Sequence, residues 1–142
     1  MVALLDSATV AAFLDRDDGF HVAADARVRE LAGRDQLTVS VITYAQLLTG
    51  AGLGHHDERT VRSFFTDLID EVHEVDRPVA ERAAQLRVGK PSLRLRDALI
   101  LATADLRDAE VVITADRRWT GVLPGRRIEL LGADQAPPSR LD

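Results

Sequence analysis

The sequence contains one long apolar run, Arg96-Asp97-Ala98-Leu99-Ile100-Leu101-Ala102-Thr103-Ala104. Five apolar residues follow Asp97 without a break, and no Gly or Pro interrupts them, which is typical of a helix. A helix that is apolar on nearly every face is expected to be buried. An acidic residue at its head either favours the helix dipole or serves a binding site, because an unpaired buried carboxylate is costly. Asp97 alone does not distinguish these two roles.

The composition is that of a single globular domain. The chain has 142 residues, 46% of them hydrophobic, which is enough for one core. It has no Cys, which excludes disulfides, thiolate metal sites and Cys nucleophiles. An acid at position 6 interrupts the apolar N-terminal run, and no apolar run reaches the roughly 20 residues of a membrane span. We therefore expect a soluble, cytoplasmic protein that does not bind membranes.

The net charge of −5 hides an asymmetry along the chain. Residues 1–76 carry 6 basic and 14 acidic groups, whereas residues 77–127 carry 11 basic and 6 acidic groups. Lys90 is the only Lys, so the basic charge of the second half is almost entirely Arg. Arg makes planar, bidentate contacts to phosphate, although the number of Arg residues can also reflect the base composition of the genome.

Short strands alternate with helices along the chain. We expect strands at residues 2–5, 37–40, 73–75, 110–114 and 127–130, and helices at 9–14, 21–32, 42–48, 58–69, 78–88 and from 97 onward. Ser7 is the expected N-cap of the first helix, and Pro78 the expected first residue of the fifth. This order predicts an α/β fold with a short-stranded, mostly parallel sheet flanked by helices. The expected domain is 1–132, followed by a flexible tail at 133–142.

Three acids occupy positions that a parallel sheet would bring together. Asp6 directly follows the first strand, Asp116 follows a late strand by two residues, and Asp97 begins the buried helix. If those two strands are neighbours, both of their acids lie at the edge where α/β proteins bind ligands. Converging carboxylates repel one another unless one is protonated or a cation holds them, and oxygen ligands select Mg²⁺ or Mn²⁺. Alternatively, Asp6 and Asp116 each cap a helix or turn.

Four segments together resemble the PIN domain, and specifically the VapC-type toxins of type II toxin–antitoxin pairs. They are residues 4–8 (LLDSA), 40–50 (SVITYAQLLTG), 96–104 (RDALILATA) and 112–119 (VITADRRW). The resemblance implies a PIN-like fold, an Mg²⁺- or Mn²⁺-dependent endoribonuclease, a small VapB-like antitoxin as partner and a homodimer. It makes Asp6 and Asp97 the chief metal ligands and catalytic residues, with Asp116 as a further acid. Ser7 and Thr114 would orient carboxylates or a water.

Gln46 is the one departure from the family pattern, which has Glu at this position. An amide oxygen can bind a hard cation, but it carries no charge and cannot act as a general base. The chain could be a naturally weakened enzyme, an engineered inactive form, or an enzyme for which one metal held by Asp6, Asp97 and Asp116 suffices. The alternative function is accordingly a catalytically weakened or inactive scaffold that binds antitoxin or RNA.

Other features of the sequence bear on these two functions. Arg94, Arg96, Arg117 and Arg118 flank the acids and are either RNA-binding residues or ordinary surface charges. His55-His56 lacks the spacing of a metal site. Phosphotransfer domains of the receiver and haloacid-dehalogenase types also place an Asp after the first strand. Ala8 and the turn position of Lys90 exclude both, because the charge that each mechanism needs is missing.

Overall fold

The computed structural model describes residues 1–132, so the expected tail at 133–142 lies outside the described residues. The strands are β1 (Val2–Leu5), β2 (Gln36–Ser40), β3 (Glu71–His73), β4 (Val111–Thr114) and β5 (Arg127–Leu130). The helices are α1 (Ser7–Leu14), α2 (His21–Leu31), α3 (Val41–Gly52), α4 (Glu58–Asp67), α5 (Arg77–Gly89) and α6 (Leu95–Leu106), with a 3₁₀ helix η1 (Arg117–Trp119). The expected α/β fold is confirmed.

The five strands form one sheet in the order β3-β2-β1-β4-β5, and every pairing is parallel. β1 is central and pairs with β2 on one side and with β4 on the other. Since successive side chains of a strand point to opposite faces, Leu5 joins one core cluster and Leu4 the other. Strands buried on both faces are the reason for the nearly continuous apolar sequences of β1 and β4.

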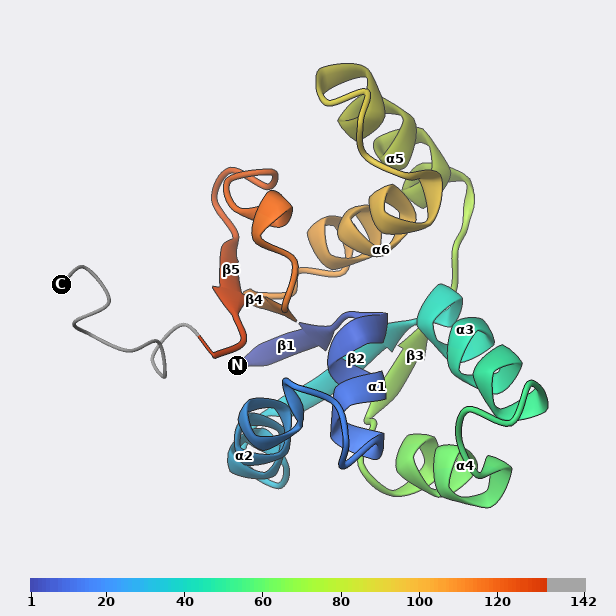
Figure 1. The fold of residues 1–142 in the computed structure, drawn as a ribbon. Helices are drawn as coiled ribbons and strands as arrows, with labels where there is room; N and C mark the ends of the chain where they lie inside the picture. The colour runs from blue at the N-terminus through green and yellow to red at the C-terminus, as the bar shows by residue number, and fades with distance from the viewer. Residues whose placement is uncertain (133–142) are drawn as a thin grey trace, which may run out of the picture.

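Helices cover both faces of the sheet (Figure 1). One core cluster draws its buried residues from α1, α2, α3 and α4, including Val61, Phe64 and Phe65. The other draws them from α5 and α6, together with Trp119 and Leu123. No helix within residues 1–132 combines the length and apolar character that a membrane crossing needs.

The structure corrects three local expectations. Asp6, not Ser7, is the N-cap of α1, because Asp6 is still extended and its Oδ1 accepts from the Thr9 amide at 2.8 Å. Pro78 is the second residue of α5, since Arg77 begins the helix after the N-cap Asp76. The third strand is Glu71–His73 rather than 73–75, because pairing with β2 sets its register.

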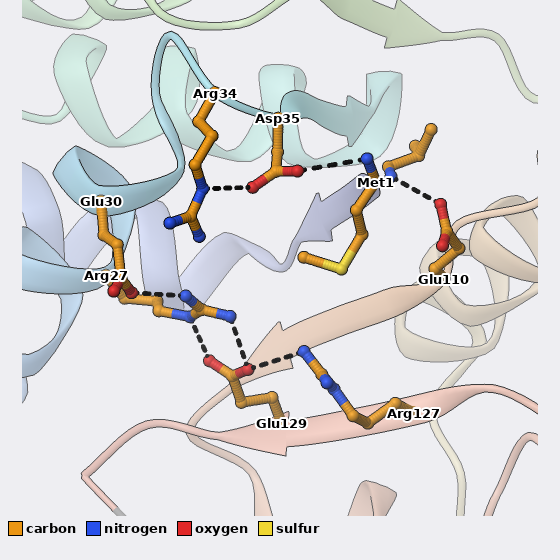
Figure 2. Close-up of polar contacts among 9 residues, drawn as sticks. Met1, Arg27, Glu30, Arg34, Asp35, Glu110, Arg127 and Glu129 are labelled. Carbon is orange, nitrogen blue, oxygen red and sulfur yellow. Dashed lines mark hydrogen bonds and ion pairs between the residues drawn. The ribbon is translucent and has the colours of Figure 1, made fainter.

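Ion pairs and hydrogen bonds at the start of β1 and along β5 join segments that are distant in the sequence (Figure 2). The α-amino group of Met1 lies 3.1 Å from Asp35, which precedes β2. The guanidinium of Arg27 on α2 donates to both carboxylate oxygens of Glu129 on β5, at 2.6 and 2.9 Å. The Val2 amide donates to Glu110 at 3.0 Å. These polar groups thus bind one another.

The burial of α6 predicts a large difference between two Leu→Ala substitutions on the same helix. Leu101 is fully buried, whereas Leu95 is 54% exposed. Leu101→Ala should lower the free energy of unfolding by about 2–5 kcal/mol because it leaves a cavity. Leu95→Ala should change it by less than about 0.5 kcal/mol. Urea denaturation measures both, and similar losses for the two variants would contradict the placement of the helix.

Candidate metal centre

Two of the three acids meet at the carboxyl-terminal edge of the sheet. β1 and β4 are neighbours with Leu5 opposite Ile113, and the Asp6 amide continues the ladder by donating to the Ile113 carbonyl at 3.2 Å. Asp116 follows the end of β4 by two residues. The pairing of these two strands was a condition of the sequence argument, and the structure confirms that pairing.

Asp6 is a buried carboxylate, with 4% of the residue exposed. Its Oδ1 caps α1, and its Oδ2 accepts from the Thr114 hydroxyl at 2.5 Å. Burial raises the pKa of Asp6, hydrogen bonds from Thr114 and Thr9 oppose this rise, and the negative charge of Asp97 adds to it. Asp6 and Asp97 are therefore close enough for their charges to repel.

Thr114 connects Asp6 to Asp116. Its hydroxyl donates to Asp6 and accepts from the Asp116 amide at 3.0 Å. Thr114 is fully buried, so this hydroxyl has no competing solvent contact. The link sets the backbone at the end of β4 relative to the Asp6 carboxylate.

Asp97 lies in the first turn of α6 and is half-buried. Burial raises the pKa of its carboxyl, Asp116 adds to the rise, and the nearby arginines oppose it. Asp97 and Asp116 line the same small recess, of about 80 Å³. The other lining residues are Lys90, Ser92, Leu93, Arg94, Arg118 and Trp119.

Asp116 is held by Arg118. Its Oδ1 accepts from the Arg118 amide at 2.9 Å and from Nε at 3.0 Å, and its Oδ2 accepts from Nη2 at 2.8 Å. These hydrogen bonds keep the pKa of Asp116 below its ordinary value. The first of them also makes Asp116 the N-cap of η1.

Gln46 reaches the site through Ser7. The Ser7 hydroxyl donates to the Gln46 Oε1 and lies 3.0 Å from the Thr43 hydroxyl. Ser7 directly follows Asp6, so α3 brings the amide of Gln46 beside the start of α1. The Gln46 amide is therefore hydrogen-bonded to the residue that follows Asp6, and it adds no negative charge there.

The donor set is chemically suited to a hard divalent cation. Carboxylates, hydroxyls and one amide supply only oxygen ligands, which Mg²⁺ and Mn²⁺ prefer. Asp6 interacts with Asp97, and Asp97 with Asp116. Within residues 1–132, however, no three His, Asp or Glu side chains lie close enough together to enclose one ion. Asp6 and Asp97 would be the principal ligands, while Asp116 is engaged by Arg118.

The four arginines singled out in the sequence are all exposed, but they are not equivalent. Arg94 and Arg118 line the recess, and Arg94, Arg96 and Arg118 all oppose the rise in the pKa of Asp97 that burial causes. Within residues 1–132 the Arg117 side chain makes no hydrogen bond or ion pair.

Two further residues of the recess were not anticipated. Lys90, whose Nζ donates to the Arg118 carbonyl at 3.0 Å, was used in the sequence argument only to exclude a receiver domain. The sequence signal for Lys90 is that it is the only Lys in the chain and lies shortly before Asp97. Trp119 is 3% exposed, and its indole nitrogen has no hydrogen-bond partner in the described part of the chain.

Residues 3–122 match the family model of the PIN domain. The chain belongs to the PIN domain family. The resemblance inferred from the four motifs is thereby confirmed at the level of the family. A search of curated proteins by sequence finds no match.

Solved structures of PIN domain toxins and their complexes share the fold. A toxin–antitoxin complex from Klebsiella pneumoniae contains a chain 28% identical, with a TM-score of 0.69, and the match covers 87% of this chain and 94% of that one. DNA-bound VapBC from Salmonella typhimurium matches at 24% identity and a TM-score of 0.71, covering 91% and 97%. Mycobacterium tuberculosis VapC20, a Sarcin-Ricin loop cleaving toxin, matches at 17% identity and 0.63, covering 78% and 86%.

The burial of Asp6 predicts that its charge destabilises the metal-free protein. A carboxyl whose pKa is raised by folding contributes most stability below the pKa of the unfolded chain, about 3.9, and this contribution is lost as pH rises through the raised value. Asp6→Asn should therefore increase the free energy of unfolding at neutral pH, in chelator, by on the order of 1 kcal/mol. Asn also serves as an N-cap, so the cap of α1 is kept.

Thermal denaturation across pH, with chelator and with Mn²⁺, measures this effect. Mn²⁺ should raise the melting temperature of the wild type and not that of Asp6→Asn. An Asn variant less stable than the wild type at pH 7 in chelator would contradict the destabilising role of the Asp6 charge.

Proposed function

We propose that this protein is an Mg²⁺- or Mn²⁺-dependent endoribonuclease that acts as the toxin of a toxin–antitoxin pair. The observation that carries the proposal is the buried carboxylate of Asp6, placed where β1 ends and within electrostatic reach of Asp97. Asp97 adds to the raised pKa of Asp6, Asp116 adds to that of Asp97, and neither Asp6 nor Asp97 forms an ion pair within residues 1–132. Carboxylates arranged in this way are more typical of a cation site than of a structural ion pair.

Each group of the site has a role in this reaction. Asp6 and Asp97 would hold the cation, Asp116 is a further acid, and Ser7 and Thr114 orient the polar groups around them. When bound, the cation supplies a water nucleophile at neutral pH and neutralises charge on a phosphodiester. The exposed arginines would bind the RNA backbone and bring a phosphate group to the acids. These residues are Arg94, Arg96, Arg117 and Arg118.

A small VapB-like antitoxin is the proposed protein partner. The Klebsiella pneumoniae relative is part of a toxin–antitoxin complex, and the Salmonella typhimurium relative is part of a VapBC complex. RNA as the substrate agrees with the Sarcin-Ricin loop cleavage by VapC20. A homodimer and a cytoplasmic location complete the proposal, since VapC-type toxins are typically dimers that act on cellular RNA.

The second candidate is a PIN scaffold with weakened or absent catalysis that acts by binding antitoxin or RNA. Gln46 favours it, because its amide receives the Ser7 hydroxyl where a Glu would contribute a charge. A protein of this kind binds its partner and cleaves no RNA with any divalent ion. The two candidates thus differ in one measurable property, metal-dependent cleavage.

Asp97→Asn tests the proposed activity. Asn is nearly the same size but has no charge, so the rate of Mn²⁺-dependent cleavage of a structured RNA should fall at least about 100-fold. Chelator should abolish cleavage by the wild type. Asp105→Asn on the same helix is the control, because Asp105 pairs with Arg82 and Arg126 away from the site. Cleavage that survives chelation or the Asp97 substitution would exclude the proposed mechanism.

Gln46→Glu separates the two candidates. The added charge should strengthen binding of the divalent ion and raise the Mn²⁺-dependent cleavage rate about 10-fold or more. Gln85→Glu adds the same charge on the exposed surface of α5 and should leave the rate unchanged. Equal rates for the wild type and Gln46→Glu would show that position 46 does not limit catalysis.

A further inference from the structure

The guanidinium of Arg118 lies beside two of the three acids. It contacts both oxygens of Asp116, lines the recess that Asp97 shares, and its own pKa is raised by Asp116 and then by Asp97. Arg118 in turn opposes the rise in the pKa of Asp97 that burial causes. A side-chain cation therefore already compensates part of the negative charge of this site.

Arg118 occupies most of the acceptor capacity of Asp116. A carboxylate has about four lone-pair positions, and three of those on Asp116 receive hydrogen bonds from Arg118. A divalent ion at the remaining position of Oδ2 would lie beside the positive guanidinium and be repelled. If Nε and Nη2 withdraw, Oδ2 becomes free, while the bond from the Arg118 amide still holds Oδ1.

Breaking the ion pair between Arg118 and Asp116 costs little free energy. The Arg118 side chain is 69% exposed, and exposed ion pairs contribute only about 0–1 kcal/mol. Guanidinium groups bind phosphate with the same bidentate geometry that they use for carboxylates. An RNA phosphate group at the mouth of the recess can therefore replace Asp116 as the partner of Arg118.

The position of Arg118 is set from outside its own turn. Lys90 donates to the Arg118 carbonyl and anchors η1 against the turn before α6. Both polar groups of the Arg118 backbone are thus held: Lys90 donates to its carbonyl, and its amide donates to the Asp116 cap. The exposed side chain can change partner without moving the turn.

We propose that Arg118 is a positioning residue that couples RNA binding to metal binding. Its guanidinium keeps the Asp116 carboxylate from binding the cation until an RNA phosphate group binds the guanidinium instead. This rests on the proposed nuclease function. Because coupling is reciprocal, the metal should equally favour binding of the phosphate group.

Mn²⁺ affinity, measured by calorimetry on the intact protein, tests the first half of this proposal. Arg118→Gln should bind Mn²⁺ about three- to fivefold more tightly than the wild type, the equivalent of losing one exposed ion pair. Arg117→Gln removes the same charge one residue away and should raise the affinity less than about twofold. An Arg118→Gln affinity equal to or weaker than that of Arg117→Gln overturns the proposal.

Dimethyl phosphate, a simple phosphodiester, tests the coupling. At matched ionic strength it should tighten Mn²⁺ binding to the wild type and have no such effect on Arg118→Gln, an outcome that a purely structural role would not produce. Equal effects on both proteins overturn the coupling. If all variants show Mn²⁺-dependent RNA cleavage but the same Mn²⁺ affinity, the nuclease stands and the role of Arg118 is wrong. If none binds Mn²⁺, both are wrong.

Discussion

The parallel pairing of β1 with β4 is the constraint on which the site depends. It buries the Asp6 carboxylate at the end of β1 and sets the Thr114 hydroxyl of β4 against it. A buried charge is costly unless it is compensated. Here the cap of α1 and one hydroxyl compensate only partly, so the fold retains a carboxylate whose pKa is raised. A bound cation would complete that compensation, so the raised pKa of Asp6 relates the fold directly to the proposed chemistry.

Two groups of charged residues illustrate how the same residue types serve different ends. Arg27 and Glu129 pair bidentately and join α2 to β5, as Figure 2 shows. Among residues 1–132, Asp6 and Asp97 have no such bidentate Arg partner, and Asp116 has one only in the exposed Arg118. The Arg27–Glu129 pair joins two elements of the fold, whereas the charges of Asp6 and Asp97 are not compensated by an ion pair of this kind.

The capping and metal interpretations of the acids turn out to be compatible. Asp6 caps α1 and Asp116 caps η1, while Asp97 lies in the first turn of α6. A helix N-terminus stabilises negative charge. Each acid is thus held in place by a local interaction that the sequence alone can indicate. The second carboxylate oxygen of Asp6 accepts from Thr114, and that of Asp116 accepts from the Arg118 side chain. Local structure thus fixes the backbone at each acid, and the hydrogen bonds to the second oxygens orient the Asp6 and Asp116 carboxylates.

The alternation of strands and helices, the buried run after Asp97 and the acids that end β1 and β4 were readable from the sequence, because each depends on neighbouring residues only. The N-cap of α1 was misassigned by one residue, since the end of β1 is set by its pairing with β4. Gln46 could be named as a departure, but its contact with Ser7 joins residues 39 positions apart. The sequence by itself determined the fold class and the acids. Only the tertiary structure decided that Lys90 supports Arg118 and that Asp97 shares a recess with Asp116, because these partners are distant along the chain and meet only in the folded protein.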